Sequence, residues 1–233
     1  MFKKLKNLVS NRPQRAVDPS SFGDPLAEQT DWEPLSTGGA NFRTHRLVPV
    51  SDFRLEFRST LGARLFAWVF LFFGLLAPVV IILAEDLRPS TMFASPPFWF
   101  ALLFSTAFCG AAFFLHRQFC SPIVFDKDTR EYTRKKRLFP SDNAPGFPVD
   151  LQRIRGIQLL REWVSGSESS YYSYELNVVL EDASRVLVVD HGNRDKLVSD
   201  ADVLAAFLGV PLWDGTDPEG AATEERATEG GTS

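Results

Sequence analysis

Residues 65–84 read LFAWVFLFFGLLAPVVIILA, twenty consecutive residues without a charge. At about 1.5 Å rise per residue, a helix of this length matches the roughly 30 Å hydrocarbon core of a bilayer. A second uncharged run covers residues 89–115, with its apolar part from residue 97. Core helices of soluble proteins rarely stay free of charge on every face for this long. The two runs therefore predict a transmembrane helical hairpin within residues 65–115, with spans at about 65–84 and 97–115.

Lys and Arg residues flank this hairpin unevenly. Five Arg residues lie between positions 43 and 64, and seven Lys or Arg residues lie between positions 117 and 137. The loop between the two runs holds only Arg88, next to Glu85 and Asp86. By the positive-inside rule, both termini are expected in the cytoplasm and the loop outside. Neither run contains Asp, Glu, Lys or Arg, which argues against a transporter.

The composition of the 233 residues excludes several classes of protein. The net charge of −4 argues against a nucleic-acid-binding protein, which is usually basic. Two Cys residues provide neither a disulfide framework nor a zinc cluster. The sequence has no phosphate-binding loop, no glycine fingerprint for dinucleotides, and neither HExxH nor GxSxG. We therefore expect no enzyme, no cofactor and no nucleic-acid partner.

The regions on both sides of the hairpin have the alternating pattern of β-strands. The clearest strand is residues 172–181, in which Tyr172, Tyr174 and Leu176 share a face opposite Glu175 and Asn177. The segment 154–163 fits either a strand or a short helix. The helical hairpin is inserted after the second expected strand, so the sequence leaves open which strands pair across the hairpin. The expected strands are 44–50, 54–58, 123–125, 131–137, 154–163, 172–181 and 185–190.

One amphipathic helix is expected near the C-terminus, at residues 195–208. Leu197, Ala201, Leu204 and Leu208 form its apolar stripe, and Gly209 is placed to cap it. The fold class is therefore a membrane α-helical hairpin plus an α+β domain, mainly antiparallel and split by the two helices. The expected parts are a flexible N-terminal arm (1–40), a first β-hairpin (41–60), the helical hairpin (65–115), the remainder of the domain (120–214) and a disordered tail (215–233).

About seven strands followed by a C-terminal helix resemble the pleckstrin-homology-like fold. Four segments are distinctive: GGANFRTHR (38–46), SSYYSYELN (169–177), VDHGN (189–193) and FLGVPLWD (207–214). In these segments the chain resembles a group of uncharacterised proteobacterial inner-membrane proteins with two spans. The resemblance covers roughly residues 38–214 and implies a bacterial inner-membrane location with a pleckstrin-homology-like (PH-like) cytoplasmic domain.

The strongest candidate site is the basic cluster Arg134, Lys135, Lys136 and Arg137. It follows the second span by about twenty residues, where anionic headgroups are dense, and each such charge near the surface contributes about 1 kcal/mol. The cluster could bind lipid headgroups or a protein partner. The alternative, which the sequence favours, is a topology signal that keeps this flank inside.

A weaker candidate is Asp190-His191-Gly192-Asn193, in which the Asp could tune a His general base. No partnered nucleophile is evident, so a structural turn is the preferred interpretation. The three His residues lie far apart and lack metal-ligand spacing, so no metal site is expected.

Two classes of function remain. The first is a non-catalytic membrane protein whose cytoplasmic domain binds a protein partner or anionic lipid headgroups. The second is an immunity or defence protein that neutralises a membrane-active toxin through its spans. A neighbouring toxin gene would favour the second class.

Overall fold

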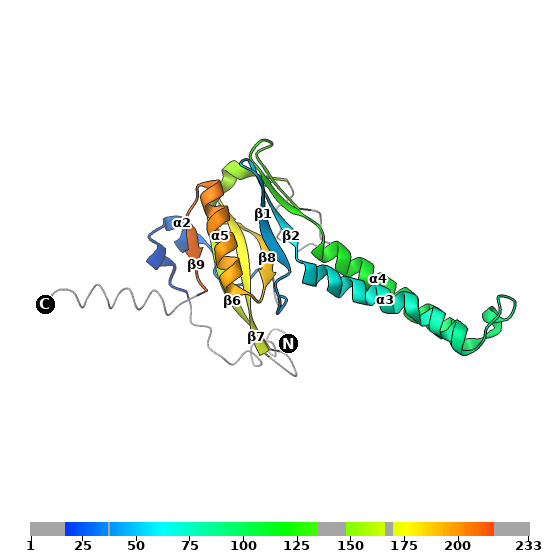
Figure 1. Cartoon of the computed structure of the whole chain (residues 1–233). Helices are drawn as coiled ribbons and strands as arrows, with labels where there is room; N and C mark the ends of the chain where they lie inside the picture. The colour runs from blue at the N-terminus through cyan, green and yellow to red at the C-terminus, as the bar shows by residue number, and fades with distance from the viewer. Residues whose placement is uncertain (1–16, 37, 135–147, 166–169, 217–233) are drawn as a thin grey trace.

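The computed structural model describes residues 17–36, 38–134, 148–165 and 170–216. In these residues a β-domain carries a long pair of helices that projects from one end (Figure 1). The described part contains nine strands in two sheets and four α-helices, so the predicted α+β class is confirmed. The helices are α2 (Pro25–Gln29), α3 (Leu61–Ala84), α4 (Pro96–Phe119) and α5 (Arg194–Leu208).

Helices α3 and α4 are the two apolar runs, and by length and composition each could cross a membrane. Helix α3 begins at Leu61 because the Thr60 hydroxyl accepts the backbone N–H of Ala63 at 3.3 Å. The two helices lie side by side along their length (Figure 1). A Cβ atom at Gly74 would lie 2.9 Å from Cys109 Sγ, so glycine permits this close approach.

The first sheet is antiparallel and follows chain order: β1 (His45–Ser51), β2 (Arg54–Ser59), β3 (Ile123–Asp126), β4 (Glu131–Arg134) and β5 (Val149–Asp150). The chain leaves this sheet after β2, runs through α3 and α4, and returns at β3. Strands β2 and β3 nevertheless pair directly, with Leu55 opposite Phe125 and Phe57 opposite Ile123. The helical hairpin returns the chain to its point of departure, so the sheet continues across the insertion.

The second sheet has the order β8-β7-β6-β9. Its strands are β6 (Ile154–Ser165), β7 (Ser170–Leu180), β8 (Arg185–His191) and β9 (Leu212–Asp214), and β9 is parallel to β6. The segment 154–163, which fitted a strand or a helix, is a strand because it pairs with β7 along its length. The short strands β5 and β9 account for the difference from the seven expected.

The main core lies between the two sheets and under α5. Phe125 and Tyr132 stack there with ring centroids 4.5 Å apart. Helix α5 is capped by Asn193, whose side chain accepts the N–H of Lys196, and it ends at Gly209 in the left-handed conformation. Its predicted stripe packs into the core: three of the four residues are fully buried and Leu208 is partly buried.

Residues 17–36 differ from the flexible arm that the sequence predicts for residues 1–40, of which residues 1–16 lie outside the described residues. Residues 17–36 form the 3-10 helix η1 (Pro19–Phe22) and helix α2, and they pack on the second sheet. Ala27 is fully buried against Val179 and Trp213. We call residues 17–40, without residue 37, the arm. It folds because its few apolar residues find partners that lie far away in the sequence.

The prediction of a disordered tail from residue 215 is wrong for its first two residues, which are ordered. The Gly215 N–H donates to the Leu159 carbonyl at 3.0 Å, and Thr216 is buried beside Arg194. Residues 217–233 lie outside the described residues.

Candidate functional site

Arg134, the first residue of the predicted basic cluster, is the last residue of β4. It pairs with Ile123, which begins β3 only four positions after the end of α4. This register places Arg134 at the end of the sheet from which the helices project. Lys135, Lys136 and Arg137 lie outside the described residues.

The guanidinium of Arg134 also connects the two sheets. Its Nη1 donates to the backbone carbonyls of Leu187 at 2.9 Å and Val188 at 3.3 Å, both in β8. Both bonds use Nη1, and an arginine carries five N–H donors in all. Arg134 therefore has a structural role on one side and can present donors on the other.

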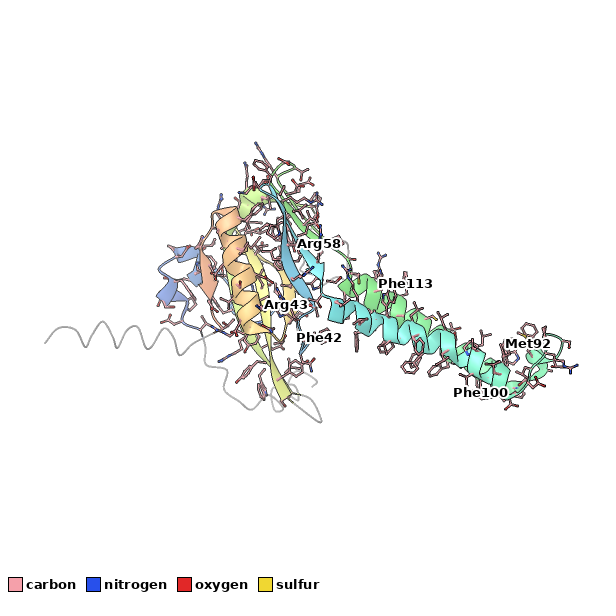
Figure 2. All side chains as sticks on the ribbon, viewed as in Figure 1. Phe42, Arg43, Arg58, Met92, Phe100 and Phe113 are labelled. Atoms are coloured by element: carbon pink, nitrogen blue, oxygen red, sulfur yellow. The ribbon has the colours of Figure 1, made fainter. Side chains whose placement is uncertain are left out.

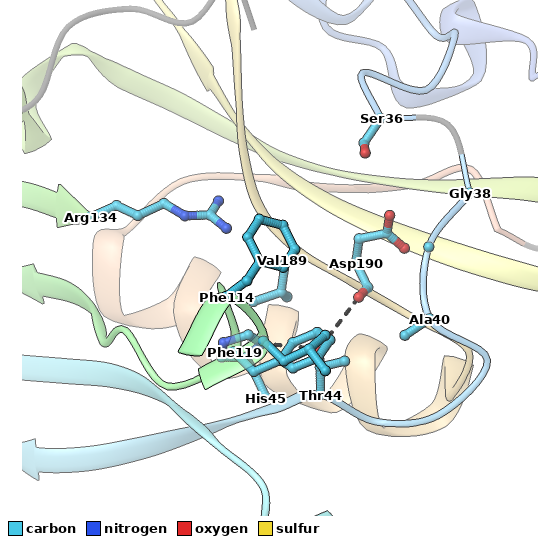
Figure 3. Close-up of a pocket in the computed structure, with 12 residues that line it drawn as sticks. Ser36, Gly38, Ala40, Thr44, His45, Phe114, Phe119, Arg134, Val189 and Asp190 are labelled. Atoms are coloured by element: carbon cyan, nitrogen blue, oxygen red, sulfur yellow. Dashed lines mark hydrogen bonds between the residues drawn. The ribbon is translucent and has the colours of Figure 1, made fainter. Parts of the chain in front are cut away.

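Arg134 borders a pocket of about 390 Å³ at the junction of the β-domain and α4 (Figure 3). This volume lies within the range of small-molecule sites, about 300–1,000 Å³. The arm, β1, β8, β4 and the end of α4 all contribute to it. We call it the junction pocket, and its lining is Ser36, Gly38, Gly39, Ala40, Thr44, His45, Phe114, Leu115, Phe119, Arg134, Val189 and Asp190.

The arm forms one wall of the junction pocket because two carboxylates hold its backbone. Glu175 of β7 accepts the N–H groups of Leu35 and Ser36, each at 3.0 Å. Glu162 of β6 accepts the N–H of Gly38 at 3.0 Å. Carboxylates at a run of backbone N–H groups make strong, charge-assisted hydrogen bonds. They fix the path of the chain into the pocket.

A polar wall lies opposite Arg134. Ser173 donates a short hydrogen bond to the Asp190 carboxylate. The Thr44 hydroxyl lies 3.0 Å from His45 Nδ1 and donates to the Asp190 backbone carbonyl at 3.5 Å. Gly39 packs against the same carboxylate, since a Cβ atom there would lie 1.7 Å from Asp190 Oδ1. These contacts fix the orientation of Asp190.

The third wall is apolar and comes from the last turns of α4, with Phe114, Leu115 and Phe119. Phe42, just before β1, ties this part of the helices to the β-domain (Figure 2). Its ring centroid lies 5.9 Å from that of Phe66 and 6.4 Å from that of Phe119. The pocket thus lies where side chains of both parts meet.

The neighbouring residue Arg43 anchors this connection to α5. Its Nη2 donates to Asp200 at 2.6 Å, and its Nε donates to the His45 carbonyl at 2.9 Å. Burial raises the pKa of Asp200 above its ordinary value, although Arg43 opposes the shift. Arg43 therefore fixes the entry of β1 beside the pocket.

The second sequence candidate, Asp190 to Asn193, spans the end of β8 and its connection to α5: Asp190 and His191 end β8, and Gly192 and Asn193 lead to α5. His191 is completely buried, and its Nδ1 accepts the N–H of Asn193 at 3.2 Å. Burial, with a smaller effect of Arg43, lowers the pKa of His191 to about 4, so the ring is neutral at pH 7. In this buried place it fits a structural role. Among the described residues no group of three His, Cys, Asp or Glu could hold a metal ion.

Arg134 and Asp190 are separate candidates in the sequence, and only the fold brings them to one pocket. Arg134 lies 56 positions before Asp190 in the chain. Thr44, Phe114 and the carboxylate of Glu175 were not predicted as site residues at all. The adjacent glycines Gly38 and Gly39 were the available signal, because paired glycines permit close approach of the backbone.

No family model, no curated protein and no solved structure matches this chain.

Proposed function

We propose that this chain is a non-catalytic integral protein of the bacterial inner membrane. Its cytoplasmic, PH-like domain docks on anionic lipid headgroups through Arg134, Lys135, Lys136 and Arg137. The observation that carries the proposal is the direct pairing of β2 with β3 across the helical hairpin. If α3 and α4 span the membrane, this pairing holds the end of β4 beside the headgroups.

The lengths of the helices and the flanking charges support the membrane assignment. Helix α3 has 24 residues, which corresponds to about 36 Å at 1.5 Å per residue. The excess of Lys and Arg on the side of the β-domain supports a cytoplasmic location for both termini. The loop between α3 and α4 then lies on the outer side.

The order of the elements supports the PH-like assignment. An antiparallel sheet in chain order precedes a second sheet, and helix α5 follows its last antiparallel strand. The resemblance to two-span proteobacterial inner-membrane proteins, over roughly residues 38–214, agrees with this order. The PH-like fold and the relation to these two-span proteins are both parts of the proposal.

The position of Arg134 supports docking on headgroups. It ends β4 level with Ile123, close to the end of α4, and three more basic residues follow it in the sequence. Four charges at about 1 kcal/mol each would hold the β-domain on the headgroups, because the two helices already tether it to the membrane. The interaction should weaken with salt, because the screening length falls from about 10 Å at 0.1 M to about 3 Å at 1 M.

The test compares anionic lipid retention by the full chain and by a Lys135→Gln/Lys136→Gln/Arg137→Gln variant. Arg134 stays, because it also connects the sheets. The protein is purified in mild detergent from vesicles of phosphatidylglycerol and phosphatidylcholine, and the retained phosphatidylglycerol is measured at low and high salt. The charge-matched control replaces three basic residues outside the cluster by Gln: Arg153 and Arg155 around the start of β6, and Lys196 on α5.

We expect the parent and the control to retain phosphatidylglycerol at low salt and to lose it at high salt. The triple variant should retain much less than the parent at low salt and as little as the parent at high salt. Equal retention by parent and triple variant would refute headgroup docking. A protein partner would then be the better candidate for the basic cluster.

A further inference from the structure

We propose that the outer face of the second sheet binds an extended acidic segment of a protein partner, and that the arm occupies this site as an internal substitute. We call this face the arm site; it consists of Gln158, Glu175, Asn177, Val179, Arg185 and Trp213. The partner segment carries an aspartate followed by an aromatic residue, as the arm does at Asp31 and Trp32. This inference goes beyond headgroup docking and does not depend on it.

The arm site lies on the face of the second sheet opposite the main core. Successive residues of a strand point to opposite faces. Leu176 and Val178 of β7 lie in the main core, whereas Val179 packs against Ala27 of the arm. The apolar contacts of the arm thus form a cluster of their own, beside β9 at Trp213 (Figure 1). The arm can therefore leave the sheet without opening the main core.

The arm site binds the main chain of the arm at four points. Glu175 accepts two successive backbone N–H groups of the arm, each at 3.0 Å. Arg185 donates to the Glu33 carbonyl at 2.7 Å, and Gln158 donates to the Asp31 carbonyl at 3.0 Å. Every residue except proline carries both a backbone N–H and a C=O group. Another extended segment can therefore make the same four bonds.

Two side chains of the arm indicate which segments the arm site selects. The Asp31 carboxylate accepts from Arg185 at 2.8 Å, and the Arg185 side chain is 6% exposed. Because a buried charge without its partner is costly, the site favours an acidic residue at this position. Trp32 follows directly and packs on the cluster that contains Val179 and Trp213. The site therefore selects an aspartate followed by an aromatic residue.

Two buried polar atoms of the arm site are not used by the arm. The side-chain oxygen of Asn177 and the indole N–H of Trp213 have no hydrogen-bond partner among the described residues. The two side chains are 0% and 1% exposed. Since buried polar groups in proteins are nearly always paired, these atoms mark points at which a ligand can supply one donor and one acceptor. A partner segment that supplies both should bind more tightly than the arm does.

The arm competes with any such segment because it is part of the same chain. A short flexible connection gives a tethered segment an effective concentration of about a millimolar. The connection includes Gly38, whose φ of +80° is in the left-handed region that favours glycine. A free peptide with the sequence of the arm should therefore displace it at about millimolar concentration, and at much lower concentration once the arm binds less well.

The test measures binding of a fluorescently labelled peptide, with the sequence of residues 17–36, to the full chain in detergent by fluorescence anisotropy. The arm variant, Asp31→Ala/Trp32→Ala, weakens the arm of the chain itself and leaves the arm site intact. The peptide should bind the arm variant at least about tenfold more tightly than the parent. Glu28→Ala/Gln29→Ala, at two exposed positions of α2, is the matched control and should behave as the parent.

A second peptide tests the chemistry of the partner. The same peptide with Asp31→Ala should bind the arm variant about tenfold or more weakly, because it lacks the carboxylate that Arg185 binds. Equal affinity of the two peptides would show that the site does not select an acidic segment, and would overturn the proposal.

Equal binding of the first peptide by the parent and the arm variant would also overturn the proposal. So would a lack of binding by an arm variant whose β7 amides exchange as slowly as those of the parent. A further measurement needs no variant: in the isotope-labelled parent, the peptide at about millimolar concentration should speed hydrogen exchange of residues 17–36, and unchanged exchange would refute displacement of the arm.

Two other results separate this proposal from its alternatives. Dissociation of parent dimers by the peptide would show that a second copy supplies the segment, in place of a different protein. Retention of phosphatidylglycerol by the arm variant should equal that of the parent, since residues 135–137 are unchanged. Failure of headgroup docking and failure of the arm site are therefore distinguishable.

Discussion

Glu175→Ala should release the arm from the second sheet and open the junction pocket. Glu175 is buried in β7, and its two carboxylate oxygens accept the backbone N–H groups of Leu35 and Ser36. Asn177 donates to the same carboxylate at 2.6 Å. Alanine removes all three acceptor contacts and leaves three donors in a space that water enters only if the arm moves.

The size of the effect follows from these contacts. A hydrogen bond to a charged group contributes about 1.5–3 kcal/mol, so the two bonds to the arm represent about 3–6 kcal/mol. Removal of the buried carboxylate also removes its desolvation penalty, and the released N–H groups can bind water once the arm has left. We therefore expect a net loss of about 2–4 kcal/mol, expressed as local release of the arm.

The assay is hydrogen exchange of the full chain in detergent, followed by mass spectrometry of peptides from residues 17–36. The variant should exchange these amides about 30-fold or more faster than the parent, which corresponds to about 2 kcal/mol. Glu181→Ala is the control, since the side chain of Glu181 makes exposed ion pairs with Arg153 and Arg155. If the arm exchanges at the same rate in Glu175→Ala and in the parent, these carboxylate contacts do not hold it.

Three further changes test other parts of the structure. Leu204→Asp places a charge at a fully buried position on α5 and should lower the free energy of unfolding by about 4 kcal/mol or more. The unfolding midpoint should fall accordingly, and a midpoint equal to the parent's would mean that α5 does not pack on the core at Leu204. His191→Gln should flatten the dependence of stability on pH. The pKa of His191 is about 4 in the folded chain and 6.5 in the unfolded chain, so folding favours the neutral ring. The contribution of His191 to the free energy of unfolding is therefore complete above pH 6.5 and is lost as the pH falls to about 4. Parent and variant should differ by about 3 kcal/mol in their loss of stability between these pH values, and parallel curves would contradict the burial of a neutral ring. Phe42→Ala should loosen the β-domain on the helices, because it removes ring contacts to Phe66 and Phe119 at about 0.5–1.5 kcal/mol each. Spin-label distances between β8 and α3 should broaden, and an unchanged distribution would show that Phe42 does not connect the two parts.

The sequence predicted the elements whose patterns are local. The apolar runs located α3 and α4, and the structure extends the first run back to Leu61 and the second on to Phe119. Strict alternation located β7, and the stripe with Gly209 located α5 to within one residue. These elements carry their own period, so tertiary contacts were not needed to find them.

The arm shows what local patterns could not reveal. Its Pro and Ser residues suggest an irregular segment, but Arg185 is almost fully buried beneath it and donates to the Glu33 carbonyl at 2.7 Å and to Asp31 at 2.8 Å. The Gln158 side chain donates to the Asp31 carbonyl at 3.0 Å. These partners lie more than a hundred residues apart, and burial lowers the pKa of Arg185 despite its acidic neighbours. Only the folded chain shows that the arm covers the polar residues Gln158 and Arg185 of the second sheet.

The candidate site was predictable only in part for the same reason. Arg134 was selected for its charge, and Asp190 was selected beside a His. Their common pocket requires the second sheet to pack against the first, with the end of α4 and the arm closing the sides. Each of these arrangements depends on contacts between distant segments. A single sequence gives no direct signal for them.

The most direct test of the account is the side of the membrane on which β1–β2 and the α3–α4 loop lie. Single cysteines replace Asp52, in the β1–β2 turn, and Ser90, in the loop, in a chain whose Cys109 and Cys120 are changed to Ala. Both positions are exposed. An impermeant maleimide on intact spheroplasts should label the Ser90→Cys chain at once and the Asp52→Cys chain only after lysis. Labelling of both chains from the same side would contradict a β-sheet interrupted by a membrane-spanning hairpin.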